Sequence, residues 1–220
     1  MKRNSILAIH GFSGAGKSAA KKAVMEFLYD HKYFSTGDTA RAFAKDLGME
    51  ITEYMKHARE NNIPIDAKLD DSLKKLSTTD QKWVVDSRLG YYHLNFDSHG
   101  NQLKGSDKIS FNVLLCGDST LIAKRRWRQN RKDNYKKYKR LTIAQTAEMI
   151  RIRDKKDIEK YAQLYPETDC TDWKNYDLVI ITTETSKNQT ASDILRYYAM
   201  WQEGKYKRRL LIRGSITKYL

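Results

Sequence analysis

Residues that can bind phosphate lie near the start of the chain. The segment that fits the pattern G-x-x-x-x-G-K-[ST] consists of Gly11, Phe12, Ser13, Gly14, Ala15, Gly16, Lys17 and Ser18. In such a loop the glycines let successive backbone N–H groups point inward, and the helix that follows adds the positive end of its dipole. Lys17 is expected to reach the outer phosphates, and the Ser18 hydroxyl is expected to bind Mg²⁺. We therefore predict a nucleoside triphosphate site to which every residue of the segment except Phe12 contributes.

Further charged residues follow two expected strand ends. The apolar run at residues 83–86 ends in Asp86, which is positioned to hold Mg²⁺ near the phosphates. Arg88 follows two residues later, and Arg41 follows an expected turn at residues 35–38. Each guanidinium can donate two parallel hydrogen bonds to a dianionic monophosphate. We therefore predict that Arg41 and Arg88 project toward the phosphate loop and bind a second phosphorylated molecule.

The elements that position these residues alternate between strands and helices. Apolar runs at residues 6–10, 83–85, 111–116 and 178–181 predict buried strands, and residues 19–29 have helical spacing. That helix is expected to bury Ala20, Ala23, Val24, Phe27 and Leu28. Strands that alternate with helices form a parallel sheet, which needs helices on both faces. We therefore predict a three-layer α/β/α fold with about five parallel strands and a ligand site at their carboxyl ends.

Composition limits the classes of protein that remain. The chain has 220 residues, of which 40% are hydrophobic, and only 2 are cysteines, too few for a disulfide framework. No apolar run approaches the roughly 20 residues that cross a bilayer. We therefore predict a globular cytoplasmic protein without a membrane partner. Residues 95–110 lack periodicity and predict a surface loop or hairpin, to which we assign no role.

The positive charge is concentrated in two segments. The formal net charge is +14, and residues 124–140 contain ten basic residues and one acidic residue. Residues 205–218 contain six basic residues and no acidic residue. The rest of the chain is close to neutral, so the basic segments predict a polyanionic partner. Nucleotide phosphates and nucleic acid both fit that description.

In their order along the chain, these motifs resemble those of cytidylate kinases, particularly the compact archaeal-type branch. Besides the phosphate loop, the resemblance rests on residues 35–41, 44–49, 86–90, 153–161 and 176–180 and on a basic helix around Arg125 and Arg126. It spans about residues 5–200. It implies a P-loop nucleoside monophosphate (NMP) kinase fold and the transfer of a phosphoryl group from ATP, with Mg²⁺, to CMP or dCMP.

The resemblance also implies roles for single residues around the acceptor. Arg41 and Arg88 resemble the family's clamp on the acceptor phosphate, and Gly37 and Asp38 lie in the same motif as Arg41. Asp157 stands at a position that resembles a sugar contact. These residues are therefore the expected binding site for the nucleoside monophosphate.

A lid is expected to complete the site. Arg153, Asp157 and Lys160 are spaced by four and three residues, so they share one face of a helix. Arg153 and Lys160 resemble catalytic lid residues that act together with Lys17, and Arg125 is expected to bind ATP. The implied organisation is a kinase domain at residues 1–200, with an NMP-binding insertion at about 41–80, a lid at about 124–166 and a basic tail at 201–220.

Two alternatives remain open from the sequence. No motif identifies the acceptor base, so the chain could phosphorylate another ribo- or deoxyribonucleoside monophosphate. It could also be a catalytically idle P-loop protein that binds RNA or DNA through residues 124–140 and the tail. Stabilisation by CMP with an ATP analogue would favour the kinase, and steep salt-dependent binding to nucleic acid would favour the second alternative.

Overall fold

A computed structural model gives the fold. It describes residues 5–88, 93–94, 108–132, 138, 140–165, 169–206 and 211–213. Most of the predicted loop at residues 95–110 and most of the basic tail lie outside the described residues. Among the residues that are described, no helix combines the length and the hydropathy of a membrane span.

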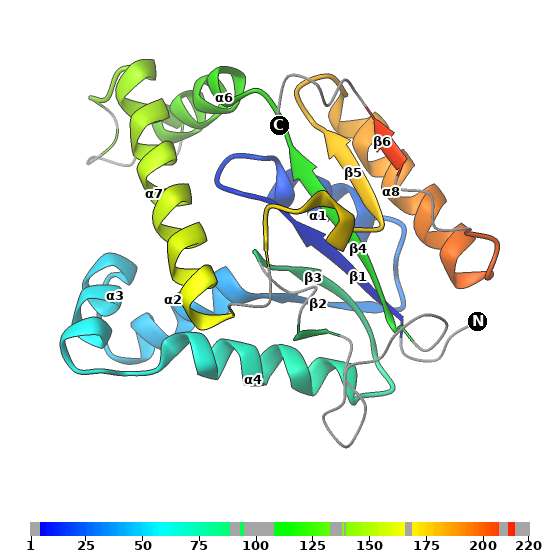
Figure 1. The fold of residues 1–220 in the computed structure, drawn as a ribbon, viewed down its shortest axis with the longest axis horizontal. Coiled ribbons are helices and arrows are strands. Elements are labelled where there is room, and N and C mark those ends of the chain that lie inside the picture. The colour runs from blue at the N-terminus through cyan, green and yellow to red at the C-terminus, as the bar shows by residue number, and fades with distance from the viewer. Residues whose placement is uncertain are drawn as a thin grey trace.

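Six parallel strands form one sheet in the order β2-β3-β1-β4-β5-β6 (Figure 1). The strands are β1 (Ile6–His10), β2 (His31–Ser35), β3 (Lys82–Asp86), β4 (Ser110–Cys116), β5 (Leu178–Ile181) and β6 (Leu211–Arg213). Asp86 is in register with Ile9 of β1 and with Ser35 of β2, so the three strands end at one edge of the sheet. The predicted parallel α/β fold is confirmed. Strand β6, from the basic tail, adds one strand to the five expected.

Helices cover both faces of this sheet. The helices are α1 (Lys17–Met25), α2 (Thr36–Asp46), α3 (Ile51–Glu60), α4 (Ile65–Ser77), α6 (Ser119–Lys132), α7 (Ile143–Leu164) and α8 (Lys187–Gln202), with a short 3₁₀ helix at Trp173–Asn175. On one face Leu7 of β1 packs in a cluster with Val24 of α1 and Ile194 of α8. On the other face Ile6 packs in a cluster with Leu73 of α4. Because side chains of a strand alternate between faces, adjacent residues of β1 supply both layers.

Two helical insertions lie beside the carboxyl edge of the sheet. Helices α2 to α4 stand between β2 and β3 and have a cluster of their own that includes Ala44 and Tyr54. Helices α6 and α7 stand between β4 and β5 and pack through Ile122 and Ile150. In Figure 1, α7 runs from α6 toward α2 and α4. These helices overlap the ranges expected for the NMP-binding insertion and the lid, although α2 and α6 begin about five residues earlier. The two roles stay predictions.

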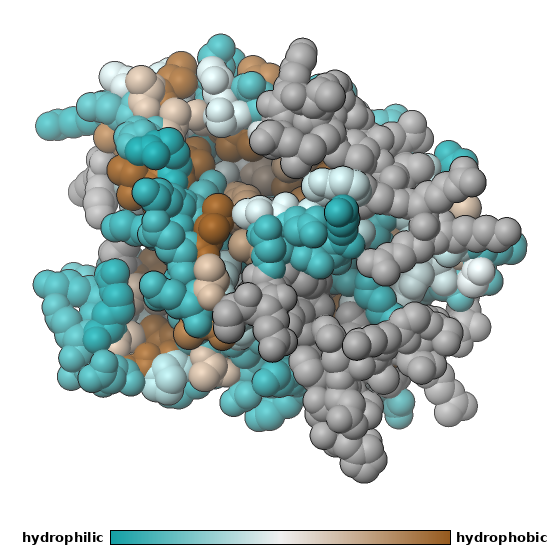
Figure 2. Space-filling model, viewed as in Figure 1, coloured by the Kyte–Doolittle hydropathy of each residue, from teal (hydrophilic) through white to brown (hydrophobic). Residues whose placement is uncertain are grey.

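Helix α7 is attached to the phosphate loop by apolar packing. Its inner side contributes Ile158 and Tyr161 to a cluster that also contains Tyr165, the residue after its end, and Phe12 of the loop. Its outer side is mainly hydrophilic in the space-filling view (Figure 2). This amphipathic pattern fixes which face of α7 is presented to the loop.

Two local predictions were wrong. Residues 35–38 do not form a free turn, because helix α2 begins at Thr36 and the Ser35 hydroxyl caps it by accepting from the Asp38 N–H at 3.2 Å. Phe27 was expected in the core and is 64% exposed. Helix α1 ends at Met25, so Phe27 lies beyond the helical face that Ala20, Ala23 and Val24 bury.

Candidate active site

The loop between β1 and α1 has a backbone that only glycine adopts easily. Gly11, Gly14 and Gly16 have φ angles of 145°, 82° and 96°. A Cβ added at Gly11 would collide with the carbonyl oxygen of Leu115, and one at Gly14 would lie 2.7 Å from a methyl group of Ile122. The loop is therefore pressed against β4 and α6, and its path depends on these glycines.

Lys17 begins α1, and its ammonium group folds back over the loop. The Nζ atom donates to the carbonyl oxygens of Gly11 at 2.6 Å and Phe12 at 3.2 Å. Burial lowers the pKa of Lys17 to about 8; the negative charge of Asp86 opposes this shift, whereas the positive charge of Arg88 adds to it. An anionic phosphate at the loop would favour the charged ammonium and reverse the shift.

Asp86 and Ser18 supply oxygen atoms suited to Mg²⁺. Burial raises the pKa of Asp86, while Lys17 lowers it and Asp38 raises it. Ser18 is exposed in the first turn of α1. The described residues contain no group of three or more His, Cys, Asp or Glu side chains that could hold a metal ion. Mg²⁺ commonly binds to one or two protein oxygens together with water and substrate phosphates, so this sparse donor set fits it.

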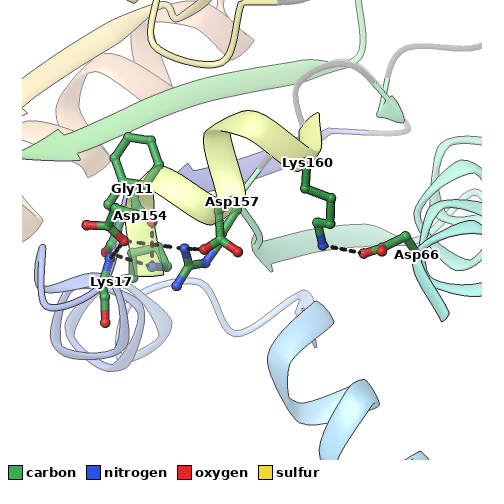
Figure 3. A network of polar contacts seen from close by, with 9 residues as sticks. Gly11, Lys17, Asp66, Asp154, Asp157 and Lys160 are labelled. Atoms are coloured by element: carbon green, nitrogen blue, oxygen red, sulfur yellow. Dashed lines mark hydrogen bonds and ion pairs between the residues drawn. The ribbon is translucent and has the colours of Figure 1, made fainter. Parts of the chain in front are cut away.

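Helix α7 places two carboxylates between the phosphate loop and Arg88. Arg88 forms an ion pair with Asp157, and its Nη1 lies 3.5 Å from Oδ1 of Asp154. The same Asp154 oxygen accepts a hydrogen bond from the Ser13 N–H at 3.4 Å. Figure 3 shows Asp154 and Asp157 side by side beneath α7, with Lys17 next to Asp154. Carboxylates and phosphates are both anions, so they compete for these donors.

Positive charge converges at the same place from three elements. Desolvation lowers the pKa of Arg153 in α7, and the like charges of Arg88 after β3 and Arg126 in α6 lower it further. Arg153 and Arg88 also act on Lys17 in this direction. Mutual repulsion among cations is offset by a bound anion, so the cluster is suited to a phosphate group.

Two predicted residues lie elsewhere. Lys160 donates to Asp66 of α4 at 2.8 Å, and in Figure 3 it points away from Lys17. Arg41 is exposed and forms an ion pair with Asp38 within α2, just after Gly37. The positive charge of Arg41 still lowers the pKa of Asp86. The structure thus brings Lys17, Asp86, Arg88 and Arg153 together, whereas Arg41 and Lys160 have other partners.

A pocket opens on the side of the loop that faces α8. It has a volume of about 280 Å³, and its lining includes Gly16, Ala20, Arg125, Thr182, Lys187 and Thr190. Arg125 donates to the carbonyl oxygen of Thr182 at 2.7 Å, and the Thr182 hydroxyl donates to the carbonyl oxygen of Ala15 at 3.1 Å. From the sequence, a role was predicted for Arg125, which lines this pocket, and none was predicted for Thr182. Thr182 belongs to no recognisable motif. The one signal that could have indicated its place in the pocket is its position directly after the apolar run that forms β5.

The fold and the site define a P-loop kinase-like protein, with a phosphate loop between the first strand and the first helix and helical insertions beside it. The chain belongs to the family described as an AAA domain (AAA_17), whose profile matches residues 10–141, more than half of the chain.

Relatives of known name extend over most of the chain. An S-adenosylmethionine-dependent nucleotide dehydratase of Lacinutrix mariniflava is 27% identical over 193 residues, which are 87% of this chain and 35% of that protein. The chain therefore spans about a third of the length of the dehydratase. A cytidylate kinase of Methanopyrus kandleri is 24% identical over 187 residues, which are 85% of this chain and 89% of the kinase.

Two solved structures share the fold of this chain. A protein of Eubacterium ventriosum has a TM-score of 0.60 at 18% identity and covers 89% of this chain and 98% of its own. The shikimate kinase of Acinetobacter baumannii, in complex with shikimate, has a TM-score of 0.53 at 14% identity and covers 92% of this chain and 96% of its own. At sequence identities this low, the two structures show only that the fold is shared.

Proposed function

We propose that the chain is a nucleoside monophosphate kinase that transfers the γ-phosphoryl group of ATP to CMP or dCMP. The observation that carries the proposal is Asp154, whose one carboxylate oxygen contacts both the Ser13 N–H of the phosphate loop and the Arg88 guanidinium. The loop N–H groups and the Arg88 guanidinium, which can each bind an anion, are thus separated only by the Asp154 carboxylate. The similarity to an archaeal cytidylate kinase supports the choice of acceptor.

ATP is the proposed phosphoryl donor. Its phosphates would bind to the backbone N–H groups of the loop and to Lys17. The pocket beside Arg125 and Thr182 is continuous with the loop through Gly16 and would receive the nucleoside part. Ser18 and Asp86 would hold Mg²⁺, which neutralises charge on the phosphates when it is bound.

The acceptor monophosphate would bind to Arg88, with Arg41 as a second guanidinium if α2 moves closer. Phosphoryl transfer needs no protein nucleophile, because catalysis comes from positioning two substrates in line and from stabilising charge on the equatorial oxygens. Lys17 and Arg153 would provide this stabilisation, and the electrostatic effect of Arg153 on Lys17 supports the assignment. In this scheme α7 excludes water from the site. The substrate phosphate replaces the carboxylates of Asp154 and Asp157 as the partner of Arg88.

The nucleotide dehydratase favours a second candidate acceptor. The name of that relative says that it acts on a nucleotide but does not specify the base. The second candidate is therefore that this chain phosphorylates a nucleotide other than CMP. The alternative of a nucleic-acid-binding protein has no support among these relatives. Within the basic segment, Arg125 is engaged by Thr182, and Arg131 lies over the ring of Trp127.

A substrate panel tests the proposed function. The chain is mixed with ATP, Mg²⁺ and each ribo- and deoxyribonucleoside monophosphate in turn, and ADP release is followed in a coupled assay. We expect the fastest turnover with CMP or dCMP and its loss in Lys17→Ala. Arg153→Ala should also lower turnover, because Arg153 is proposed to stabilise charge during the transfer. Its matched control is Arg151→Ala on the exposed face of α7, since Arg151 contacts only Glu148 among the contacts described for it. Absence of turnover with every monophosphate would refute the proposal.

A further inference from the structure

A second pocket lies between α4 and α7 and contains Arg88. Its lining includes Arg88, Asp66, Asp70, His93, Tyr161 and Tyr165. It therefore combines the cation proposed to bind the acceptor phosphate with two carboxylates of α4. A nucleoside monophosphate has the complementary character, because it is anionic at the phosphate and carries neutral hydrogen-bonding groups on the base.

The two carboxylates differ in their partners. Asp66 accepts from Lys160 at 2.8 Å, so its charge is paired. Asp70 is 19% exposed, accepts a hydrogen bond from the Tyr165 hydroxyl, and lies 3.3 Å from Nε2 of His93. In the part of the chain that the structure describes, no lysine or arginine forms an ion pair with Asp70. Asp70 is thus a largely buried carboxylate whose charge no direct cation offsets, which favours contact with a further donor.

The remaining capacity of Asp70 is that of a hydrogen-bond acceptor. A carboxylate has two oxygens with about four lone-pair directions, of which Tyr165 uses one. Burial raises the pKa of Asp70 to about 6, although the hydrogen bond from Tyr165 acts to lower it. At neutral pH most of the Asp70 side chains are therefore ionised and accept hydrogen bonds without donating any.

The walls of the pocket suit a flat ring. Tyr161 and Tyr165 contribute aromatic surface, and the rings of His93 and Tyr165 meet edge to face with centroids 5.0 Å apart. The volume is about 40 Å³, enough for a few water molecules. An entering base must therefore separate α4 from α7, which the Lys160–Asp66 ion pair holds together at this side. The tight fit favours one ring over two.

We propose, on the basis of the function above, that Asp70 selects the acceptor base by accepting a hydrogen bond from the exocyclic amine of cytosine. The acceptor phosphate would lie on Arg88, because the carboxylates of α4 repel it. Uracil carries a carbonyl oxygen in place of the amine, so its lone pairs would face those of Asp70. Asp70 is then the residue that favours CMP over UMP.

The substitution Asp70→Asn tests this inference. An asparagine can donate its amide N–H to the uracil oxygen, so the ratio of kcat/KM for CMP to that for UMP should fall by about ten-fold or more. Asp71→Asn is the matched control, because Asp71 is the next residue of α4 and is exposed. It should leave the ratio unchanged. An Asp70→Asn protein that phosphorylates CMP with the wild-type ratio would overturn the inference and leave the proposed function standing.

Binding to the unmodified chain provides a test that needs neither turnover nor a variant. The ratio of CMP to UMP affinity, measured by calorimetry, should fall as the pH is lowered through about 6, because a protonated Asp70 donates to the uracil oxygen. Burial lowers the pKa of His93 to about 4, so His93 stays neutral in this range. The other charged groups that act on Asp70 are Asp66, Lys74 and Lys160. A ratio that does not change with pH would contradict the role of Asp70. Selective binding of CMP without phosphoryl transfer would instead overturn the proposed function.

Discussion

Binding of a triphosphate at the phosphate loop should take up protons at Lys17. Burial lowers the pKa of Lys17 from 10.5 to about 8. At about pH 8, half of the molecules therefore carry a neutral amine, and at about pH 7 roughly a tenth do. Triphosphate oxygens next to Nζ favour the ammonium form. We expect uptake of about half a proton per bound nucleotide at about pH 8, and an affinity that falls as the pH rises further.

Calorimetry in buffers of different ionisation enthalpy measures this uptake directly. A non-hydrolysable ATP analogue with Mg²⁺ is titrated into the chain at about pH 8, where the nucleotide phosphates are already fully ionised. Lys17→Arg is the control, because a guanidinium stays charged throughout this range and takes up no proton. If the wild-type chain takes up no more protons than Lys17→Arg, the ammonium does not meet the phosphates and the assignment of the loop is wrong.

Three further changes have defined outcomes. Gly11→Ala should lower the free energy of unfolding by about 2 kcal/mol or more, measured by urea denaturation, because its Cβ meets the carbonyl of Leu115 at a positive φ; wild-type stability would contradict this. Asp154→Asn should lower the dissociation constant of ATP several-fold, because a neutral amide competes less well than a carboxylate for the loop N–H groups. Weaker ATP binding by this variant would refute a competition between Asp154 and the phosphates. Arg125→Ala should raise the KM for ATP but not for CMP, unlike the exposed control Arg128→Ala, and an equal effect on both substrates would exclude Arg125 from the ATP site.

The sequence was sufficient to predict the layers of the fold because each signal is local. The apolar run before Gly11 and the helical spacing after Lys17 set β1, the loop and α1 in their order. Strand β6 was not predicted, since its three residues lie in a basic segment and have no alternation of their own. Phe27 was misplaced because periodicity predicts a face of a helix but not the residue at which the helix ends.

The site was predictable where its residues follow one another, and not where it depends on packing. Lys17 belongs to a contiguous motif, Asp86 is the last residue of β3, and Arg88 follows two residues later. The contact of Asp154 with Ser13 joins residues 141 positions apart, and it depends on how α7 crosses the loop. The pocket around Asp70 likewise depends on the approach of α4 to α7. No spacing in the sequence encodes these distances, so α7 could be predicted as a helix without its partners.

Transfer of label from ATP radiolabelled in its γ-phosphate is the most direct test of the central claim that the loop and Arg88 serve two nucleotides in one reaction. The account predicts that the wild-type chain moves the label to CMP and forms labelled CDP. It further predicts that Arg88→Ala loses nearly all of this transfer but binds the ATP analogue with wild-type affinity. Label that appears only in inorganic phosphate, or full transfer by Arg88→Ala, would contradict the account.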